Sequence, residues 1–497
     1  MKKTARLLLG LLLAGSAMSQ VDRNAFERQR QQMREQYDKY KQQHQRQYDD
    51  ARKKAEVEYA AFRKRANEEY AAAVRQEWTR MGVKPAVPKP KEPAPPRPPK
   101  PQIDKIPSTV PLPQGEVVPL PKLIDPVPLP PIPEPEPSVP TMQVPFYGTR
   151  CSVHADADAL RFMLPSLEEK SMAQAWQQLS QEKYDGLLHD CMEQRDAMKL
   201  SDWGYITLLG RVSEQLLGKG SNEAVLLQMY MLAQSGYRVR IGRTGGKLVL
   251  LVPFNRPIYN YNYVFIDGIS HYVLSPEKDG GIYVCDVQFP NEKVANILMG
   301  RMPELGGGVK RSRTMQAGRF STMKATVEVE QRLVDFLNDY PLSSAWEYYA
   351  LAGFSDGVKS TLYPALRSQI DGKSKQKAAS MLLNFVQTAF DYATDDEQFG
   401  YERPLFGDES IYYPKNDCED RSIFFSILVR DLLGLDVVQV HWPGHLATAV
   451  AFPEEVEGDY FTVDGRRYTV CDPTYIGAPV GETMPQFRNV EAKLVRF

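Results

Sequence analysis

The sequence predicts an α+β fold in which a long N-terminal helix and a proline-rich linker precede a globular part built from helices and antiparallel strands. Three observations lead to this prediction. An aromatic residue recurs every eleven residues near the N-terminus, 23 of the 61 residues from Pro85 to Pro145 are proline, and two segments 198 residues apart share one order of helix, strand and hairpin signals. The predicted ranges are 1–19 for a signal peptide, 20–82 for the helix, 83–145 for the linker, and 146–300 and 315–497 for two globular domains.

The first 19 residues have the pattern of a secretory signal peptide. Lys2 and Lys3 precede an apolar run over 7–13, and small residues follow at 14–17. This run is shorter than the roughly 20 residues that span a bilayer. We therefore expect an extracytoplasmic protein, periplasmic or secreted, without a transmembrane span.

The net charge and the cysteine content limit the binding partners and the disulfide bonds that we expect. The net charge of −1 gives no electrostatic reason to expect nucleic acid as a partner. The five cysteines are an odd number, so at least one thiol stays unpaired or forms an intermolecular bond in an oxidising compartment. Cys418 is the candidate for the unpaired thiol. The pairing of Cys151, Cys191, Cys285 and Cys471 stays open.

The segment from Asp22 to Trp78 is rich in Arg, Lys, Gln, Glu and Ala and lacks Pro and Gly, which predicts one long helix. Its aromatic residues at positions 26, 37, 48, 59 and 70 form an eleven-residue repeat. Eleven residues in three turns keep this stripe on one face and favour a right-handed supercoil when helices associate. One interpretation is a coiled coil that makes the protein a homo-oligomer through residues 22–78. The other is a solvated single helix whose charges pair at i,i+4.

The proline-rich linker cannot form a packed core. Such a segment favours the extended polyproline conformation, which reaches up to about 190 Å at ~3.1 Å per residue. We expect it to act as a spacer. Further along, Gly306, Gly307 and Gly308 and the basic run over 310–313 indicate a flexible join between the two globular domains.

The strongest chemical signal lies at Cys418. An apolar run follows it and ends at Gly434, which predicts a helix with Cys418 in or just before its first turn. A thiol at that end of a helix has a lowered pKa and lies beside backbone N–H groups that can stabilise an oxyanion. The carboxylates of Asp417, Glu419 and Asp420 oppose the lowering of the pKa, so they require a metal ion, an Arg or backbone donors.

Two further residues complete a catalytic constellation. A predicted strand begins at His445, and a hairpin with an Asp-Gly turn at 464–465 leads to a strand that ends beside Asp472. In this arrangement Cys418 attacks, His445 moves the proton and Asp472 orients the imidazole. His441 is the competing histidine, but Gly444 lets the backbone approach closely next to His445. The alternative is a decayed site that keeps its scaffold and not its reaction.

These residues resemble the transglutaminase-like superfamily. The resemblance rests on Asp-Cys-Glu-Asp at 417–420, Gly-His at 444–445 and Cys-Asp-Pro-Thr at 471–474, and it covers roughly residues 375–485. It implies a papain-like fold with a triad at Cys418, His445 and Asp472.

The first of these strings is most similar to bacterial transglutaminase-like cysteine proteinases, some of which are calcium-dependent periplasmic peptidases. In those proteins the acidic residues that flank the cysteine bind calcium, which implies a calcium site at Asp417 and Glu419. Arg421 and Ser422 depart from this branch, which usually has an aromatic and a small residue there.

Residues 220–276 look like a second copy of this unit. Under the 198-residue offset Gly236 aligns with Gly434, and after one inserted residue the Asp-Gly pair at 267–268 aligns with that at 464–465. The triad is replaced by Gly220, Lys247 and Ser275. We predict a degenerate transglutaminase-like domain at 146–300 that binds or packs against the catalytic one; chance similarity is the alternative. His271 and Asp286 lie nearby without a nucleophile.

The sequence therefore predicts an exported thiol-dependent peptidase or amidase that acts on a protein or peptide substrate through a Cys418 thioester. We expect no required cofactor; the resemblance implies only an optional calcium ion. An amine-acceptor transglutaminase shares the first half-reaction and differs in what resolves the thioester. The other class is a noncatalytic envelope scaffold, in which the helix oligomerises, the linker spans distance and the globular domains bind peptide or glycan.

Overall fold

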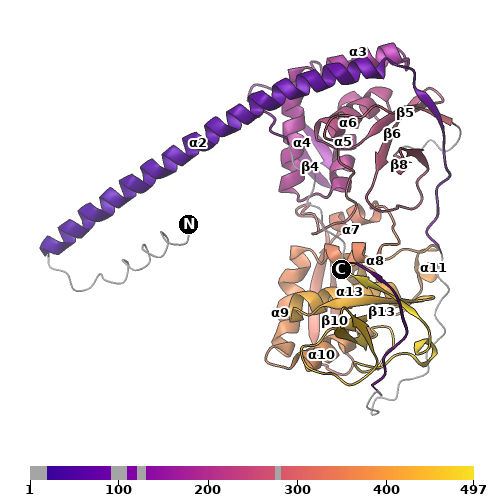
Figure 1. Cartoon of the computed structure of the whole chain (residues 1–497). Helices are drawn as coiled ribbons and strands as arrows, with labels where there is room; N and C mark the ends of the chain where they lie inside the picture. The colour runs from indigo at the N-terminus through magenta and orange to yellow at the C-terminus, as the bar shows by residue number, and fades with distance from the viewer. Residues whose placement is uncertain (1–19, 91–108, 120–129, 275–280) are drawn as a thin grey trace. The chain divides into compact units, whose positions relative to one another are not determined.

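The computed structural model describes residues 20–90, 109–119, 130–274 and 281–497, and it shows a mixed α+β chain (Figure 1). The predicted signal peptide, 1–19, lies outside the described residues. The chain divides into two compact units, Met1–Arg63 and Lys64–Phe497. Within the described residues, no helix is both long enough and apolar enough to span a bilayer.

The long N-terminal helix is α2, Gln20–Val74. In the first unit, Tyr37 and Tyr48 of the aromatic stripe are more than half exposed. In the second unit, Tyr70 is buried, and its ring centroid lies 4.4 Å from that of Trp176. The helix ends four residues before the predicted Trp78, because the Trp78 indole Nε1 donates to the Val74 carbonyl and the chain continues as strand β1, Thr79–Gly82.

The first globular part, up to about residue 300, combines helices with a six-stranded sheet in the order β1-β9-β5-β6-β8-β7. Its helices are α3 Glu169–Leu179, η1 Glu182–Tyr184, α4 Asp185–Ala197, α5 Asp202–Leu217 and α6 Asn222–Gln234. Its strands are the hairpin β3 Thr141–Phe146 and β4 Thr149–His154, and the sheet strands β5 Arg240–Thr244, β6 Lys247–Pro253, β7 Tyr263–Ile266, β8 Ile269–Val273 and β9 Gly281–Cys285.

The second globular part opens with the hairpin β10 Lys310–Gln316 and β11 Lys324–Glu330. The basic run expected in a flexible join therefore lies in a strand; one reason is that Arg313 donates to the carbonyls of Tyr413 and Pro414. The helices that follow are α7 Gln331–Asn338, α8 Trp346–Ala352, α9 Asp356–Ile370, α10 Lys375–Thr388, α11 Asp395–Gln398, α12 Gly407–Tyr412, α13 Cys418–Leu428 and the π-helical turn η2 Val429–Leu433.

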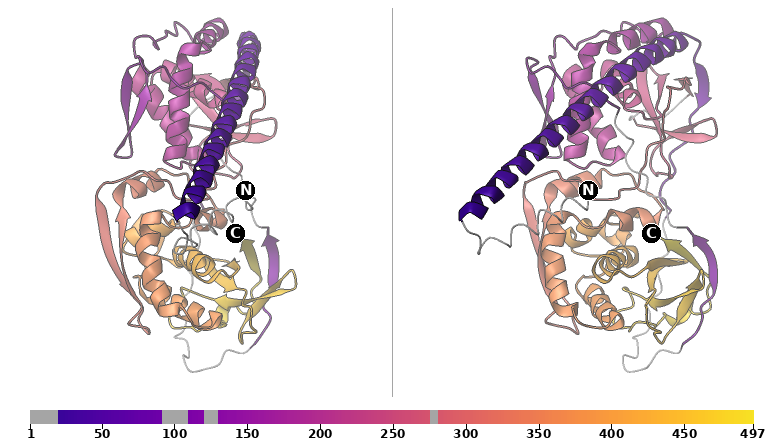
Figure 2. Two further views of the ribbon diagram at one scale, coloured as in Figure 1. Left: turned by 90° about the vertical axis from the view of Figure 1, so that its left-hand side faces the viewer. Right: turned by 60° about the vertical axis from the view of Figure 1, so that its left-hand side comes forward.

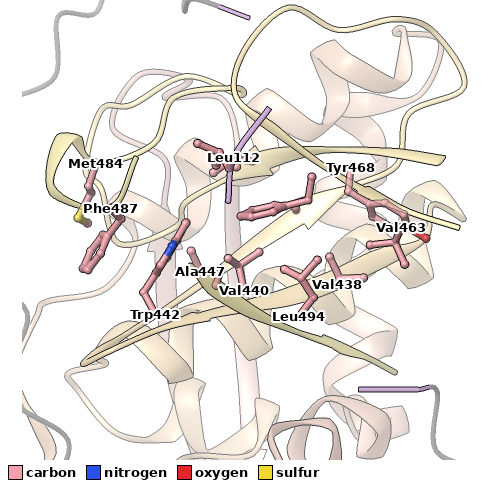
Figure 3. Close-up of a cluster of buried hydrophobic side chains, with 14 of the residues drawn as sticks. Leu112, Val438, Val440, Trp442, Ala447, Val463, Tyr468, Met484, Phe487 and Leu494 are labelled. Carbon is pink, nitrogen blue, oxygen red and sulfur yellow. The ribbon is translucent and has the colours of Figure 1, made fainter. Parts of the chain in front are cut away.

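The second sheet has the order β14-β15-β13-β12-β16-β2. Its strands are β12 Val437–Trp442, β13 His445–Val450, β14 Tyr460–Val463, β15 Arg466–Cys471 and β16 Ala492–Arg496, with the short helix η3 Pro485–Phe487 before β16. Helix α13 packs against α8, α10 and α12 and against β13 (Figure 1). A buried apolar cluster that includes Val440, Trp442 and Leu494 forms the core of this sheet (Figure 3).

The proline-rich segment does more than separate domains. Its residues Gln114–Val118 form β2, which pairs in parallel with β16 at the sheet edge, and both views of Figure 2 show this strand beside the yellow strands. Leu112 is buried in the apolar core (Figure 3), and its N–H donates to Tyr460 O. A proline-rich composition argues against a strand, so the sequence did not predict β2. Such a segment can still pair at the edge of a sheet, where few ladder hydrogen bonds are needed.

The two sheets have the same strand order and the same register. Thr244 pairs with Lys247 in the first sheet as Trp442 pairs with His445 in the second, and Leu251 pairs with Val273 as Ala449 pairs with Val470. Both Asp-Gly hairpin turns have positive φ at both residues, as a type I′ turn requires. One difference lies at the edge, where β1 runs antiparallel to β9 and β2 runs parallel to β16.

Candidate active site

Cys418 is the first residue of α13, and Asp417 is its N-cap. The Asp417 N–H donates to Asp420 Oδ2 at 3.3 Å, which satisfies one backbone donor at the helix start. Gly434 ends the helical stretch in the left-handed conformation, as the sequence predicts. Cys418 is only 7% exposed, and its Sγ donates to Glu419 Oε2 at 3.1 Å.

Cys418 is held against the strand that carries His445. It packs in one apolar cluster with Trp346, Leu446 and Val495, and Leu446 directly follows His445 in β13. Ser422, one turn further along α13, donates its hydroxyl to Leu446 O at 2.8 Å. The helix that presents the thiol and the strand that presents the imidazole are therefore fixed to each other.

The predicted histidine and aspartate do meet. His445 Nε2 lies 2.9 Å from Asp472 Oδ2, and both side chains are buried. Asp472 Oδ1 accepts the backbone N–H groups of Thr474 and Tyr475, so the carboxylate is fixed by its other oxygen. An ionised Asp472 accepts the proton on Nε2, which leaves the lone pair of the neutral imidazole on Nδ1.

The second ring nitrogen of His445, Nδ1, is left without a hydrogen bond to any residue that the structure describes. The ring is stacked on Phe487, with centroids 5.1 Å apart, which fixes its plane. His441, the competing histidine, lies on β12 with its ring 6.0 Å from Trp346, and His445 is the one that pairs with Asp472.

Two buried residues that sequence reasoning missed hold this site together. The Gln387 side-chain amide, from α10, donates to the carbonyls of Asp472, Tyr475 and Ala478 and accepts from Gly477 N, so it fixes the turn that carries Asp472. Arg421 donates to the carbonyl of Gln387 near the end of α10 and to that of Phe390 just beyond it. Nothing in the local sequence indicates that a single glutamine on an amphipathic helix fixes a distant turn in this way.

An acidic cluster lies on one side of the thiol, which contacts its member Glu419. It consists of Asp395, Asp417, Glu419 and Asp420, all of which are buried. Burial, and then the charges of Glu419 and Asp417, raise the pKa of the Cys418 thiol well above its usual value. The lowering expected from the helix start is therefore outweighed, since burial disfavours the thiolate and neighbouring carboxylates repel it.

Three members of the acidic cluster could hold a metal ion. Oxygens of Asp395, Asp417 and Glu419 all lie within 4.8 Å of one another. Asp417 Oδ1 has no hydrogen-bond partner in the described part of the chain. Burial, and then the charges of Asp420 and Glu419, raise the pKa of Asp395 to about 10. A hard oxygen donor set with an unpartnered carboxylate oxygen fits calcium, and Asp395 is a candidate ligand that the sequence pattern did not indicate.

The corresponding place in the first globular part has different chemistry. Lys247 opens β6, and its Nζ donates to Gly220 O at 3.3 Å, just before α6. Ser275 lies outside the described residues. His271 is buried between the Ile269 carbonyl and Arg238, and Asp286 pairs with Arg240. Neither has a cysteine or serine nucleophile as a partner among these contacts.

A separate cleft of about 760 Å³ is lined by aromatic and charged side chains that include Trp203, Tyr261, Tyr340, Arg403 and Glu409. The residues that line it do not include Cys418, His445 or Asp472. The cleft is therefore separate from the candidate active site.

All five cysteines lie in described segments, and none of them forms a disulfide. Comparisons with protein-family models, with curated proteins and with solved structures give no match for this chain.

Proposed function

We propose that this protein is an exported thiol-dependent peptidase or amidase with a papain-like, transglutaminase-like catalytic domain at 315–497. The observation that carries the proposal is the 2.9 Å contact between His445 Nε2 and Asp472 Oδ2, which leaves Nδ1 unpartnered on the strand that packs against Cys418. The resemblance at 417–420, 444–445 and 471–474 supports the same reading.

The chemistry follows from these positions. Nδ1 of His445 takes the thiol proton as Sγ of Cys418 attacks the substrate carbonyl, and Asp472 stabilises the imidazolium that forms. Backbone N–H groups at the start of α13 stabilise the oxyanion. The amine leaves with the proton from His445, and a thioester with Cys418 remains. Water then resolves the thioester in a peptidase or amidase, and a primary amine resolves it in an amine-acceptor transglutaminase.

We further propose calcium as the ion held by Asp395, Asp417 and Glu419. Bound there, a divalent cation supplies positive charge beside Cys418 and satisfies oxygens that otherwise repel one another. The contacts of two of these residues are compatible with such an ion. The Arg403 N–H donates to Asp395, and Asp417 keeps one oxygen without a hydrogen bond to the described residues. The residues present therefore fit the ion that the resemblance implies.

The matching strand order and register support the proposal that residues 146–300 are a degenerate duplicate of the catalytic domain. The duplicate keeps the sheet and replaces the reactive residues by Gly220 and Lys247. Its proposed role is a binding or packing surface for the catalytic domain.

Two observations favour a noncatalytic scaffold as the second candidate: Cys418 is almost fully buried, and its thiol pKa is raised. In that function both globular parts bind peptide or glycan without chemistry, and the N-terminal helix oligomerises.

Cleavage profiling tests the proposal. The mature chain is incubated with a complex peptide mixture and calcium, and new peptide termini are identified by mass spectrometry. We expect new termini with the wild-type chain and none with Cys418→Ala. Added methylamine separates the resolving steps, because transfer places methylamide on the acyl product. Equal product from Cys418→Ala would overturn the assignment.

A further inference from the structure

The proline-rich segment reaches the candidate active site with one lysine. Residues 84–87 are anchored on the first globular part: Lys84 exchanges backbone hydrogen bonds with Tyr263, Ala86 N–H donates to Asn262 Oδ1, and Asn260 N–H donates to Val87 O. These contacts fix the chain two residues before Lys89. The position of Lys89 is therefore set by ordered neighbours.

Lys89 carries a buried ammonium group. Its side chain is 4% exposed, and Nζ lies 3.6 Å from Glu402 Oε1 and 4.7 Å from the ring centroid of Trp346. Nζ donates no hydrogen bond to any residue that the structure describes. A buried charge is costly when its hydrogen bonds are incomplete, so the attraction of nearby anions must hold this ammonium in place.

Those anions belong to the candidate active site. Glu402, which faces the ammonium, is hydrogen-bonded to Glu419 of the acidic cluster, and the charges of Lys89 and Glu419 attract each other. Trp346, which the ammonium faces, packs in the same cluster as Cys418 and Leu446. Lys89 therefore lies between Glu402, which is hydrogen-bonded to Glu419, and Trp346, which packs in the cluster of Cys418.

We propose that Lys89 is a tethered cation that competes with a soluble divalent cation for the acidic cluster, and that its departure frees Trp346 from its place against Cys418. The proposed competition depends on the calcium site put forward under the proposed function. The observed position of Lys89 does not depend on that site. An ammonium supplies one charge without full hydrogen bonding, whereas a divalent cation binds several carboxylate oxygens directly. The segment would thus act as an internal inhibitor that calcium displaces.

Calcium titration of three variants tests the competition. Lys89→Met removes the charge and keeps an apolar stem over Trp346. Lys84→Met is the matched control, because Lys84 lies in the same segment, is exposed and is held through its backbone. Lys89→Arg keeps the charge. By isothermal titration calorimetry with calcium alone, we expect Lys89→Met to bind about tenfold more tightly than wild type, since removing a competitor raises apparent affinity. Lys84→Met and Lys89→Arg should match wild type.

A footprint on the wild-type chain needs no substitution. A lysine-acetylating reagent, read by peptide mass spectrometry, should modify Lys89 slowly without calcium and several-fold faster with it, while Lys84 reacts equally in both states. Equal calcium affinity of Lys89→Met and wild type, no binding by any form, or a Lys89 acetylation rate that calcium does not change would each overturn the proposal. Repeating the titration with Cys418→Ala separates the two claims, because cation binding does not need the thiol.

Discussion

Lys247 Nζ donates to Gly220 O at 3.3 Å, and these two residues occupy the sequence positions that align with His445 and Cys418. The contact shows that the start of the strand and the start of the helix meet in the first globular part as well. Because Thr244 pairs with Lys247 as Trp442 pairs with His445, the shared sheet puts the aligned residues in the same place. The two parts therefore share this packing, and the first has glycine and lysine where the second has Cys418 and His445.

Asp472→Asn should slow the alkylation of Cys418 by iodoacetamide by about 10²- to 10⁴-fold, the usual size of acid–base catalysis. The asparagine Oδ1 can still accept from Thr474 and Tyr475, but its amide donates toward His445 and moves the proton to Nδ1. The imidazole then cannot accept the thiol proton. Asp464→Asn, at the exposed hairpin turn, is the control and should react like wild type. An unchanged rate in Asp472→Asn would remove Asp472 from the site.

Gln387→Leu should destabilise the chain by about 2–3 kcal/mol and also slow Cys418 alkylation. Its amide hydrogens hold three carbonyls of the turn after Asp472, and buried acceptors without a donor cost free energy. Gln376→Leu, an exposed glutamine on the same helix α10, is the matched control. Urea unfolding measures the first effect and alkylation of the folded protein the second. A destabilised variant with wild-type alkylation would show that Gln387 supports the fold and does not position Asp472.

Truncation should separate the two parts of α2. A chain that begins at Lys64 should be monomeric by light scattering with unchanged stability, whereas the mature chain should self-associate through the aromatic stripe. A chain that begins at Thr79 also loses Tyr70, which packs on Trp176 and Phe289, and should be at least about 3 kcal/mol less stable. If the mature chain is itself monomeric, the helix is a solvated single helix.

His271 should make stability depend on pH. Burial, more than any other cause, lowers its pKa from 6.5 to about 4. Its Nδ1 faces the Ile269 carbonyl while Nε2 accepts from Arg238, so only the neutral ring satisfies both contacts. The unfolded chain binds this proton at a higher pH than the folded chain.

The stability that the neutral His271 contributes is therefore present above pH 6.5 and is lost as pH falls toward 4, by up to about 3 kcal/mol. His271→Gln should flatten this part of the curve in chemical unfolding at several pH values. His44→Gln, on the exposed part of α2, should leave the curve unchanged. A curve that keeps its slope in His271→Gln would assign the pH dependence to other groups.

Local sequence signals predicted the start of a strand at His445, the Asp-Gly turn at 464–465 and the end of the next strand beside Asp472, because hydrophobic alternation and turn chemistry act between neighbouring residues. Three features escaped prediction. Asp395 and Gln387 reach the site from other helices, and Lys89 reaches it from a proline-rich segment. Only tertiary packing brings such residues together. The predicted lowering of the Cys418 thiol pKa was wrong, because burial and the charges of Glu419 and Asp417 raise it. The position of a residue at a helix start indicates the helix dipole but does not indicate these two effects.

Selective alkylation of Cys418 tests the central claim most directly. The folded wild-type chain is treated with iodoacetamide near neutral pH in the presence of calcium, and each cysteine is followed by peptide mass spectrometry. The other four cysteines are also buried and serve as internal references. We predict that Cys418 reacts faster than Cys151, Cys191, Cys285 and Cys471, and that His445→Ala abolishes this difference. A Cys418 that reacts no faster than the others, or equally fast in His445→Ala, would contradict it.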